Sequence, residues 1–303
     1  MSSTLVLVSR AELPRPNFEA FLSRMGVALT VPEGAVFPIT ESSGRLVTRI
    51  HLPADEQELR TQVEAFAAEE FAGDYISAAD ICLAVVPETI TQAERLLLVM
   101  DVDSTLIQQE VIELLAAHAG REAEVAAVTE AAMRGELDFA QSLIQRVATL
   151  KDLDQQVLSE VQQRIEYSPG ARELVQRFHA AGHLVAVVSG GFQQILDPLA
   201  TDLELDYALA NTLGIVDGVL DGTVHGQIVD RATKETMLRS WAELNGIPIG
   251  ATIAAGDGAN DLDLLNAAGL GVAYNAKPAL RDRAQVKLDF KALDVIADLV
   301  LPA

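Results

Sequence analysis

Two aspartates that directly follow an apolar run are the first candidates for chemistry in this sequence. Asp101 and Asp103 come after residues 97–100, in the string Asp-Val-Asp-Ser-Thr. Alternate residues of an extended chain point to the same side, so we expect both carboxylates to lie together at the end of a strand. A calcium loop is excluded, because it needs glycine and glutamate where Leu106 and Ile112 stand. An acidic turn in solvent is the remaining alternative.

A serine-glycine pair and a lysine could bind a phosphate oxygen. Ser189 and Gly190 follow the apolar run 184–188, and a hydroxyl beside free backbone N–H groups suits an anion. Lys234 lies in the first turn of an amphipathic segment that contains Trp241. The first turn of a helix carries partial positive charge, which disfavours a cation there unless an anion is near. Taken singly, the serine-glycine pair is more often a plain turn and a lysine is more often solvated.

A second acidic segment follows another apolar run. Asp257, Asn260 and Asp261 come after residues 252–255, in the string Gly-Asp-Gly-Ala-Asn-Asp. A dinucleotide-binding loop needs glycine at position 261, and a P-loop needs Gly-Lys-Ser or Gly-Lys-Thr, so neither fits. Four acids meeting at one sheet edge need a cation between them. Oxygen ligands beside a phosphate favour Mg²⁺.

The overall charge narrows the classes of partner. There are 22 Lys and Arg against 44 Asp and Glu, a net charge of -22, which argues against a nucleic-acid partner. An anionic substrate would need a metal ion or a lysine to offset this charge locally. Cys82 is the single cysteine and excludes an internal disulfide, and no apolar run approaches the ~20 residues that span a bilayer. We expect a cytoplasmic protein with no membrane partner.

The strands and helices expected around these residues indicate an α/β fold with a doubly wound parallel sheet. Five apolar runs are expected as its strands, separated mostly by helical patterns: 97–100, 184–188, 207–210, 252–255 and 270–274. Residues 107–166 carry only helical patterns and are expected to form an inserted helical cap. Asp-Gly pairs at 217–218 and 221–222 predict a hairpin within 214–230.

The first 90 residues have a different pattern. Apolar periodicity predicts the order βαββαβ, with helices at 17–26 and from Asp55, and strands at 4–10, 36–39, 45–52 and 75–86. The polar stretch 87–94 is expected to be a linker. We therefore expect a small α+β domain at 1–90 and a larger domain at 91–303.

The four polar elements, in this order, resemble the four motifs of the haloacid dehalogenase superfamily. The resemblance covers the chain from about residue 97 to its end. A helical cap inserted after the first motif is similar to the phosphoserine phosphatase branch, and the matching segments are 101–110, 139–147, 187–192 and 256–261.

The resemblance implies that Asp101 is a nucleophile that forms an aspartyl-phosphate and that Asp103 is the general acid and base. A carboxylate with a reference pKa of ~3.9 is ionised at neutral pH and can attack phosphorus without a base. A serine alkoxide leaves poorly, so Asp103 must donate a proton. The family positions matched by Ser189, Gly190 and Lys234 bind the transferred phosphoryl group.

For the metal and the substrate, the family implies further residues. Mg²⁺ would be held by Asp101, Asp257 and the backbone carbonyl of Asp103, with Asp261 and Asn260 supporting that shell and Asn260 near the substrate. In the cap, Glu110 and Arg146 match positions that face the amino and carboxylate groups of phosphoserine. Met133 and Phe139 match apolar positions near the substrate.

The implied function is Mg²⁺-dependent hydrolysis of L-phosphoserine to L-serine and phosphate, the last step of serine biosynthesis. A phosphatase or phosphotransferase for another small phosphorylated metabolite is one alternative, and a catalytically silent phosphate-binding regulator is another. The first domain resembles ACT-type domains in pattern only. That pattern leaves open amino-acid binding, pairing into a homodimer, and a structural role.

Overall fold

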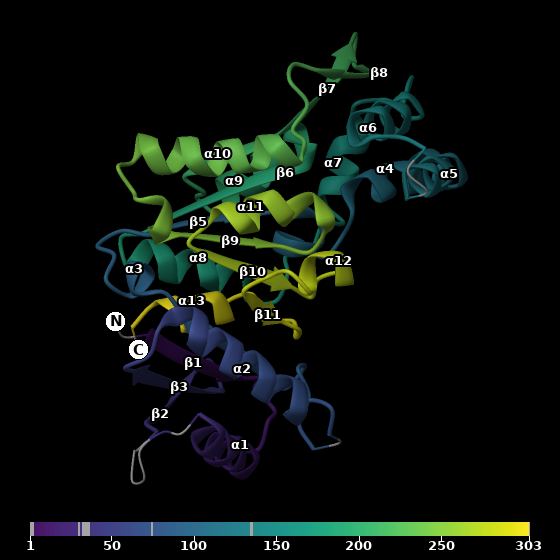
Figure 1. The fold of residues 1–303 in the computed structure, drawn as a ribbon. Helices are drawn as coiled ribbons and strands as arrows, with labels where there is room; N and C mark the ends of the chain where they lie inside the picture. Colours follow the sequence, from purple (N-terminus) through teal and green to yellow (C-terminus); the bar gives the residue numbers. More distant parts are fainter. Residues whose placement is uncertain (1–2, 30, 32–36, 74, 134–135, 303) are drawn as a thin grey trace.

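The chain forms two sheets, one in each half of an elongated molecule (Figure 1). The structure is a computed structural model that describes residues 3–29, 31, 37–73, 75–133 and 136–302. Within these residues, no helix is long and apolar enough to cross a membrane.

The larger sheet has seven strands in the order β11-β10-β9-β5-β6-β7-β8. All neighbours are parallel except β7 and β8. Its central strands are buried on both faces, as parallel strands covered by helices should be. The strands are β5 (Leu97–Met100), β6 (Leu184–Phe192), β7 (Tyr207–Val216), β8 (Val219–His225), β9 (Thr252–Gly256), β10 (Leu270–Tyr274) and β11 (Val286–Leu288). The five expected strands are all present, and β11, only three residues long, was not expected.

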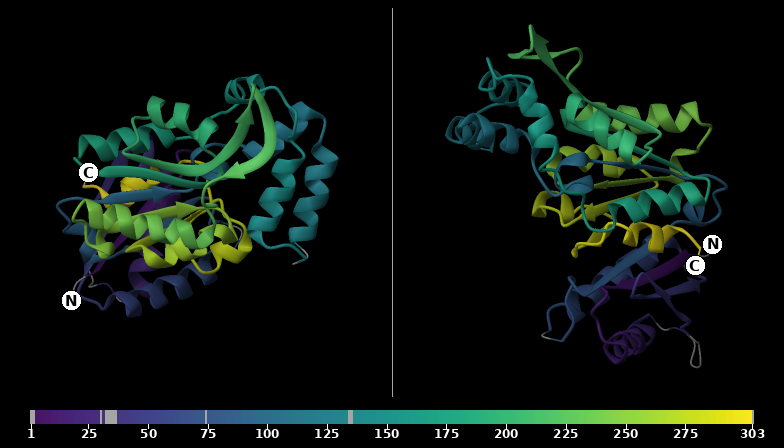
Figure 2. Two further views of the ribbon diagram at one scale, coloured as in Figure 1. Left: turned by 90° about the horizontal axis from the view of Figure 1, so that it is seen from above. Right: turned by 180° about the vertical axis from the view of Figure 1, so that it is seen from behind.

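Helices cover both faces of this sheet, which confirms the doubly wound α/β fold. Helices α10 and α11 lie on one face, and α8 and α9 lie on the other (Figure 2). The helices of this layer system are α8 (Ala171–Ala180), α9 (Gln193–Asp202), α10 (Arg231–Leu244), α11 (Leu262–Ala267), α12 (Pro278–Arg281) and α13 (Val295–Val300).

Between β5 and β6 the chain leaves the sheet and forms the expected helical cap. Its helices are α4 (Val111–Ala119), α5 (Glu122–Met133), α6 (Phe139–Ala148) and α7 (Gln156–Gln162). Asp138 and Gln141 form a reciprocal capping box that fixes where α6 begins. An isolated bridge between Ile107 and Tyr167 closes the base of the cap.

The hairpin of β7 and β8 extends from the sheet to the cap (Figure 2). Its turn is Asp217-Gly218, with φ values of 49° and 83°, the left-handed pair that a two-residue turn requires. The other Asp-Gly pair, at 221–222, lies inside β8 instead of at a turn. Three backbone hydrogen bonds join the hairpin to the segment of the cap between α6 and α7: Asp152 N to Leu220 O at 2.9 Å, Leu220 N to Leu153 O at 2.8 Å, and Gln155 N to Gly218 O at 2.9 Å.

The smaller sheet has the order β2-β3-β1-β4, with every neighbouring pair antiparallel. The predicted βαββαβ order is present as β1 (Ser3–Ser9), α1 (Arg15–Ala28), β2 (Ile39–Ser42), β3 (Arg45–Leu52), α2 (Glu56–Glu70) and β4 (Ile81–Val86). Two predicted boundaries are wrong: β4 begins at Ile81 and not at Tyr75, and β2 begins at Ile39, while position 36 lies outside the described residues. The expected linker contains a short helix, α3 (Glu88–Thr91).

Both faces of the smaller sheet are buried, one of them against the larger domain. Leu5 and Leu7 of β1 pack with α1 and α2, whereas Val6 and Val8 join the core of the larger domain. This is the alternation expected of a strand with two covered faces. Helix α13 lies between the two sheets and is buried on all sides (Figure 1).

Candidate active site

Three neighbouring strands bring the predicted residues to one edge of the larger sheet. Strands β9, β5 and β6 are adjacent and parallel, so the segments that follow them meet at their carboxyl ends. Asp101 and Asp257 follow β5 and β9 directly, and Ser189 lies near the carboxyl end of β6. Lys234 reaches the same edge from α10.

Asp101 is held in a fixed orientation by hydrogen bonds to both carboxylate oxygens. Its Oδ1 accepts the N–H of Val102 at 2.7 Å, and its Oδ2 accepts Nδ2 of Asn260 at 3.0 Å. Oδ2 also lies 2.7 Å from Nζ of Lys234. The carboxylate is only 4% exposed, and it borders the cavity described below. Ser104, two residues past Val102, takes a left-handed φ of 56°, which turns the chain sharply toward the cap.

Lys234 is a buried cation shared by two acids. Its Nζ lies 2.7 Å from both Asp101 Oδ2 and Asp261 Oδ1, and the residue is 1% exposed. Burial alone would lower the pKa of Lys234, but the charges of Asp101 and Asp261 outweigh burial and raise that pKa. The predicted lysine therefore lies at the site and not in solvent.

Asp103 lies against the last residues of β6. Its Oδ1 accepts the N–H of Val111 at 3.1 Å, at the first turn of α4. A Cβ atom at Gly191 would lie 2.9 Å from Asp103 Oδ2, so only glycine allows this approach without a shift. Burial, with the charges of Glu110 and Asp101, raises the pKa of Asp103 well above its usual range.

Asp257 and Asp261 have different surroundings. Asp261 accepts Lys234 through Oδ1 and the N–H groups of Asp257 and Gly258 through Oδ2, at 3.2 and 3.1 Å. Asp257 has a single ion pair among the described residues, with Lys277 at 3.7 Å. Burial and the charge of Asp101 raise the pKa of Asp257 to about 6 and also raise the pKa of Asp261.

These acids fit a divalent metal ion. One carboxylate oxygen from each of Asp101, Asp257 and Asp261 lies within 4.8 Å of the others. Several buried carboxylates with one buried lysine carry more negative charge than the site neutralises, and a hard cation with oxygen ligands would correct this. Both oxygens of Asp261 and both oxygens of Asp101 already accept hydrogen bonds, whereas Asp257 has only the ion pair with Lys277 among the described residues, so Asp257 has the freest carboxylate of the three.

The cap closes over these residues and forms a cavity of about 160 Å³. Glu110 precedes α4 and accepts a hydrogen bond from Oγ of Ser104 at 2.9 Å. Arg146 belongs to α6 and is half-buried. Burial lowers the pKa of Arg146, an effect opposed by the charge of Glu110. A Cβ atom at Gly190 would lie 2.8 Å from Phe139, so this glycine lets the cap close on the last residues of β6.

Most of the predicted residues meet at this cavity. Those that line it are Asp101, Asp103, Glu110, Phe139, Arg146, Gly190, Asp257 and Asn260. Ser189, Lys234 and Asp261 are buried beyond its wall, where Ser189 Oγ accepts the N–H of Gly191 at 2.8 Å. The side chain of Met133, at the end of α5, lies outside the described residues.

Five lining residues were not predicted: Ile112, Leu143, Gly191, Phe192 and Lys277. Lys277 follows β10 by three residues, and its N–H donates to the carbonyl of Asp257 at 2.8 Å. The same strand-end rule that identified the other segments would have identified this one.

Comparison with known proteins agrees with this geometry. The family model of haloacid dehalogenase-like hydrolases matches residues 98–266, which include all four polar segments. This chain belongs to the haloacid dehalogenase-like hydrolases. A phosphoserine phosphatase of Streptomyces coelicolor is 54% identical over 224 residues, 74% of this chain and 55% of that protein.

Two solved structures of this family resemble the chain. A probable phosphoserine phosphatase of Vibrio cholerae in unliganded form has a TM-score of 0.78 at 37% identity, over 98% of this chain and 86% of that one. A phospho-aspartyl intermediate analogue of phosphoserine phosphatase has a TM-score of 0.65 at 39% identity, over 69% of this chain and 100% of the other. The chain spans about half the length of the first curated relatives that it matches.

Proposed function

We propose that this hydrolase converts L-phosphoserine to L-serine and phosphate, the last step of serine biosynthesis, through a phosphate ester formed on Asp101. The names of its relatives and the arrangement of the cavity support the proposal. The observation that carries it is the position of Asp103, a carboxyl group with a raised pKa that lines the same cavity as Asp101.

In the first step, an oxygen of Asp101 attacks phosphorus and the bond to the serine oxygen breaks. Asp103 enters this step protonated and donates its proton to the departing oxygen. In the second step, Asp103 takes a proton from the water that hydrolyses the phosphoryl-aspartate. Lys234, Ser189 and the N–H groups near Gly190 would bind the phosphoryl oxygens and stabilise their charge.

We further propose that the metal is Mg²⁺, held by Asp101, Asp257 and the backbone carbonyl of Asp103. Asn260 and Asp261 would orient these ligands, Asn260 through its hydrogen bond to Asp101. When bound, Mg²⁺ would offset the repulsion between the attacking carboxylate and the phosphate.

The cap would recognise the serine part of the substrate. Arg146 can bind a carboxylate through two hydrogen bonds, and Glu110 can accept the ammonium group. Phe139 closes the cavity against Gly190 and excludes water from the reacting groups. Met133 stays a predicted substrate contact.

The decisive experiment measures phosphate release from O-phospho-L-serine, sugar phosphates and an aryl phosphate, with and without a chelator. We expect phosphoserine to give the highest kcat/KM and exhaustive chelation to stop the reaction. Activity that survives chelation would contradict the metal assignment, and a better sugar phosphate would contradict the substrate.

The same assay separates two other candidate functions. Adding alcohols as acceptors distinguishes a phosphotransferase, which would form new phosphate esters, from a hydrolase. A silent phosphate-binding regulator would release no phosphate from any substrate. A homodimer formed through the smaller domain, and amino-acid binding there, stay predictions, as does the cytoplasmic location, with which the single Cys82 agrees.

A further inference from the structure

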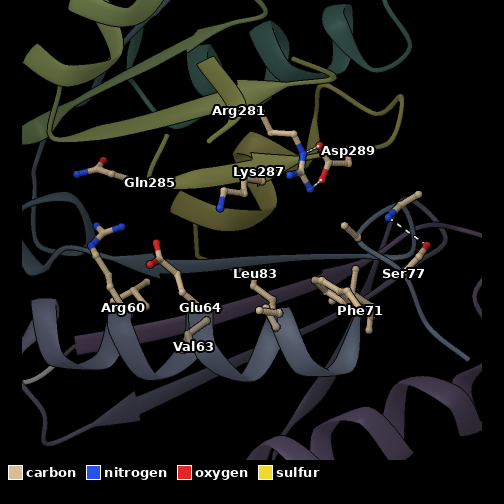
Figure 3. Close-up of a pocket in the computed structure, with 16 residues that line it drawn as sticks. Arg60, Val63, Glu64, Phe71, Ser77, Leu83, Arg281, Gln285, Lys287 and Asp289 are labelled. Atoms are coloured by element: carbon tan, nitrogen blue, oxygen red, sulfur yellow. Dashed lines mark hydrogen bonds and ion pairs between the residues drawn. The ribbon is translucent and has the colours of Figure 1, made fainter. Parts of the chain in front are cut away.

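A second cavity, larger than the catalytic one, lies between the two sheets (Figure 3). Its volume is about 630 Å³, and it is lined by α2 and β4 on one side and by residues of the segment from α12 to β11 on the other. Cavities of about 300–1,000 Å³ at domain interfaces are common sites for small ligands. The proposed reaction uses none of the residues that line it.

One part of this cavity is apolar. Val63 and Phe71 from the region of α2, and Leu83 from β4, lie along it (Figure 3). Leu83 is half-buried although its neighbours in β4 are fully buried, because its side chain faces the cavity. An apolar ligand that covered Leu83 would remove this surface from water.

The other part carries two opposite charges without a protein partner among the described residues, an exposed glutamate and a half-buried lysine. Lys287 of β11 and Glu64 of α2 point into the same end of the cavity (Figure 3). Within the described part of the chain, neither makes an ion pair or a hydrogen bond, and they do not reach each other. Arg281 and Asp289, on the same wall, differ in that they neutralise each other through hydrogen bonds of 2.9 and 2.7 Å.

Arg60 adds a buried donor to this end. Its Nε and Nη2 both donate to Oε1 of Glu56, at 3.1 and 2.8 Å, while Nη1 is buried without a partner among the described residues. An unpaired buried donor is costly, so an acceptor supplied there is favoured. A small turn of the guanidinium toward the cavity would present Nη1 to a ligand.

We propose that this cavity binds a small zwitterion with an apolar body, such as a free α-amino acid with an aliphatic or aromatic side chain. Its carboxylate would lie near Lys287 and Arg60, its ammonium group near Glu64, and its apolar part against Leu83. A simple anion would lie beside an unpaired Glu64, and a simple cation beside an unpaired Lys287. A zwitterion satisfies both charges.

The ligand would contact both domains, because Glu64 and Lys287 belong to different domains. This differs from a site within the first domain alone. Binding should therefore strengthen the contact between the domains and raise the unfolding temperature of the full chain.

Calorimetry on the full chain tests the proposal with L-leucine and L-phenylalanine as probes. The matched analogues with one charge are 4-methylpentanoate and 3-methylbutylamine for leucine. We expect at least one zwitterion to bind at a single site, and each analogue to bind weaker by about tenfold or more, the loss expected for one charged hydrogen bond. Equal binding of an analogue, or no binding of either zwitterion to the folded chain, would overturn the proposal.

Variants locate the site. Lys287→Met and Glu64→Gln should each weaken binding by about tenfold. Lys291→Met and Glu69→Gln change exposed residues outside the cavity and should leave binding unchanged. Binding that persists in Arg146→Ala would separate this cavity from product binding at the catalytic site. Binding that is insensitive to both Lys287→Met and Glu64→Gln would overturn the proposal, and the analogue series stands on the unmodified chain if a variant fails to fold.

Discussion

The molecule contains two buried clusters of charge, and they are built in opposite ways. At the proposed active site, Asp101, Asp257 and Asp261 lie around one buried cation, Lys234, which pairs with Asp101 and Asp261. At the contact between the domains, Asp294 and Asp298 of the α13 region pair with two arginines, Arg45 and Arg177. The first cluster has unneutralised negative charge, and the second is fully paired.

The paired cluster has a hydrogen bond for almost every polar atom. Arg45 of β3 binds Asp298 through Nε and Nη2 at 3.0 and 2.8 Å, and it binds Asp294 through Nη1 at 3.2 Å and through Nη2. Arg177 binds the other oxygen of Asp298 at 2.7 Å. Burial alone would lower the pKa of Arg45, but the two aspartates outweigh it and raise that pKa.

The difference shows what each cluster is for. Fully paired buried charges fix one arrangement of two domains, because removing either partner leaves an unpaired charge. Unneutralised acids make a poor structural element, but their geometry can hold a metal ion, and their mutual repulsion raises the pKa of a carboxyl group. The comparison predicts that changes in the first cluster affect chemistry and changes in the second affect stability.

The largest effect is expected for Asp101→Asn. The amide keeps the shape of the side chain but cannot act as the nucleophile, so kcat should fall by several factors of ten while the fold is kept. Steady-state phosphate release and circular dichroism measure the two quantities. Retention of more than about a percent of activity would remove Asp101 from its proposed role.

The second prediction concerns Asp298→Asn, which leaves Arg45 and Arg177 with too few partners. The free energy of unfolding should fall by about 3–5 kcal/mol, while kcat of the folded fraction stays close to that of the unmodified chain. Denaturant unfolding measures the loss. As a control, Asp263→Asn breaks an exposed pair with Arg231 and should cost about 1 kcal/mol or less. Similar losses for both would mean that burial of the pair has no consequence.

A smaller effect is expected for Arg146, which belongs to neither charge cluster and is proposed to bind the substrate carboxylate. Arg146→Ala should lower kcat/KM for phosphoserine, because it leaves the substrate carboxylate unpaired. The fall should correspond to a loss of about 2–4 kcal/mol of transition-state stabilisation. An aryl phosphate without that carboxylate serves as the control and should lose much less. Equal losses for both substrates would show that Arg146 holds the cap together and does not bind the substrate.

The smallest predicted effect is a change in stability with pH, which tests whether the acids around Asp257 carry excess negative charge. Asp257 has a pKa of about 6 when folded, against ~3.9 in the unfolded chain, so the folded state retains a proton that the unfolded state releases. Without metal, stability should fall as pH rises from about 4 to about 6. At pH 7 Asp257→Asn should then stabilise the metal-free protein by about 1–3 kcal/mol.

Thermal unfolding with and without Mg²⁺ measures this last effect. Saturating Mg²⁺ should reverse the order, because the unmodified chain gains binding energy that Asp257→Asn lacks. If the variant is less stable than the unmodified chain in both conditions, Asp257 is not part of an unneutralised cluster.

The two clusters also differ in how far the sequence predicts them. The acids of the proposed active site follow apolar runs, so the strand rule is enough to place Asp101 and Asp257 together. Arg45 and Asp298 are separated by 253 positions, and no local pattern marks either residue. Lys277 was missed although it follows a strand, because it belongs to no polar string. Strand β11 was missed because three residues give too short a pattern.

The hairpin of β7 and β8 limits how the catalytic cavity can open. Movement of the cap away from the sheet would open this cavity, yet three backbone hydrogen bonds join the cap to Gly218 and Leu220. Opening must therefore break these bonds or carry the hairpin along. The pairing of β7 with β8 shifts register between Leu213 and Ile215, and this bulge is the natural point for the hairpin to bend. Cap and hairpin tip would then travel as one body, with the rate of product escape set at a position far from the reacting atoms.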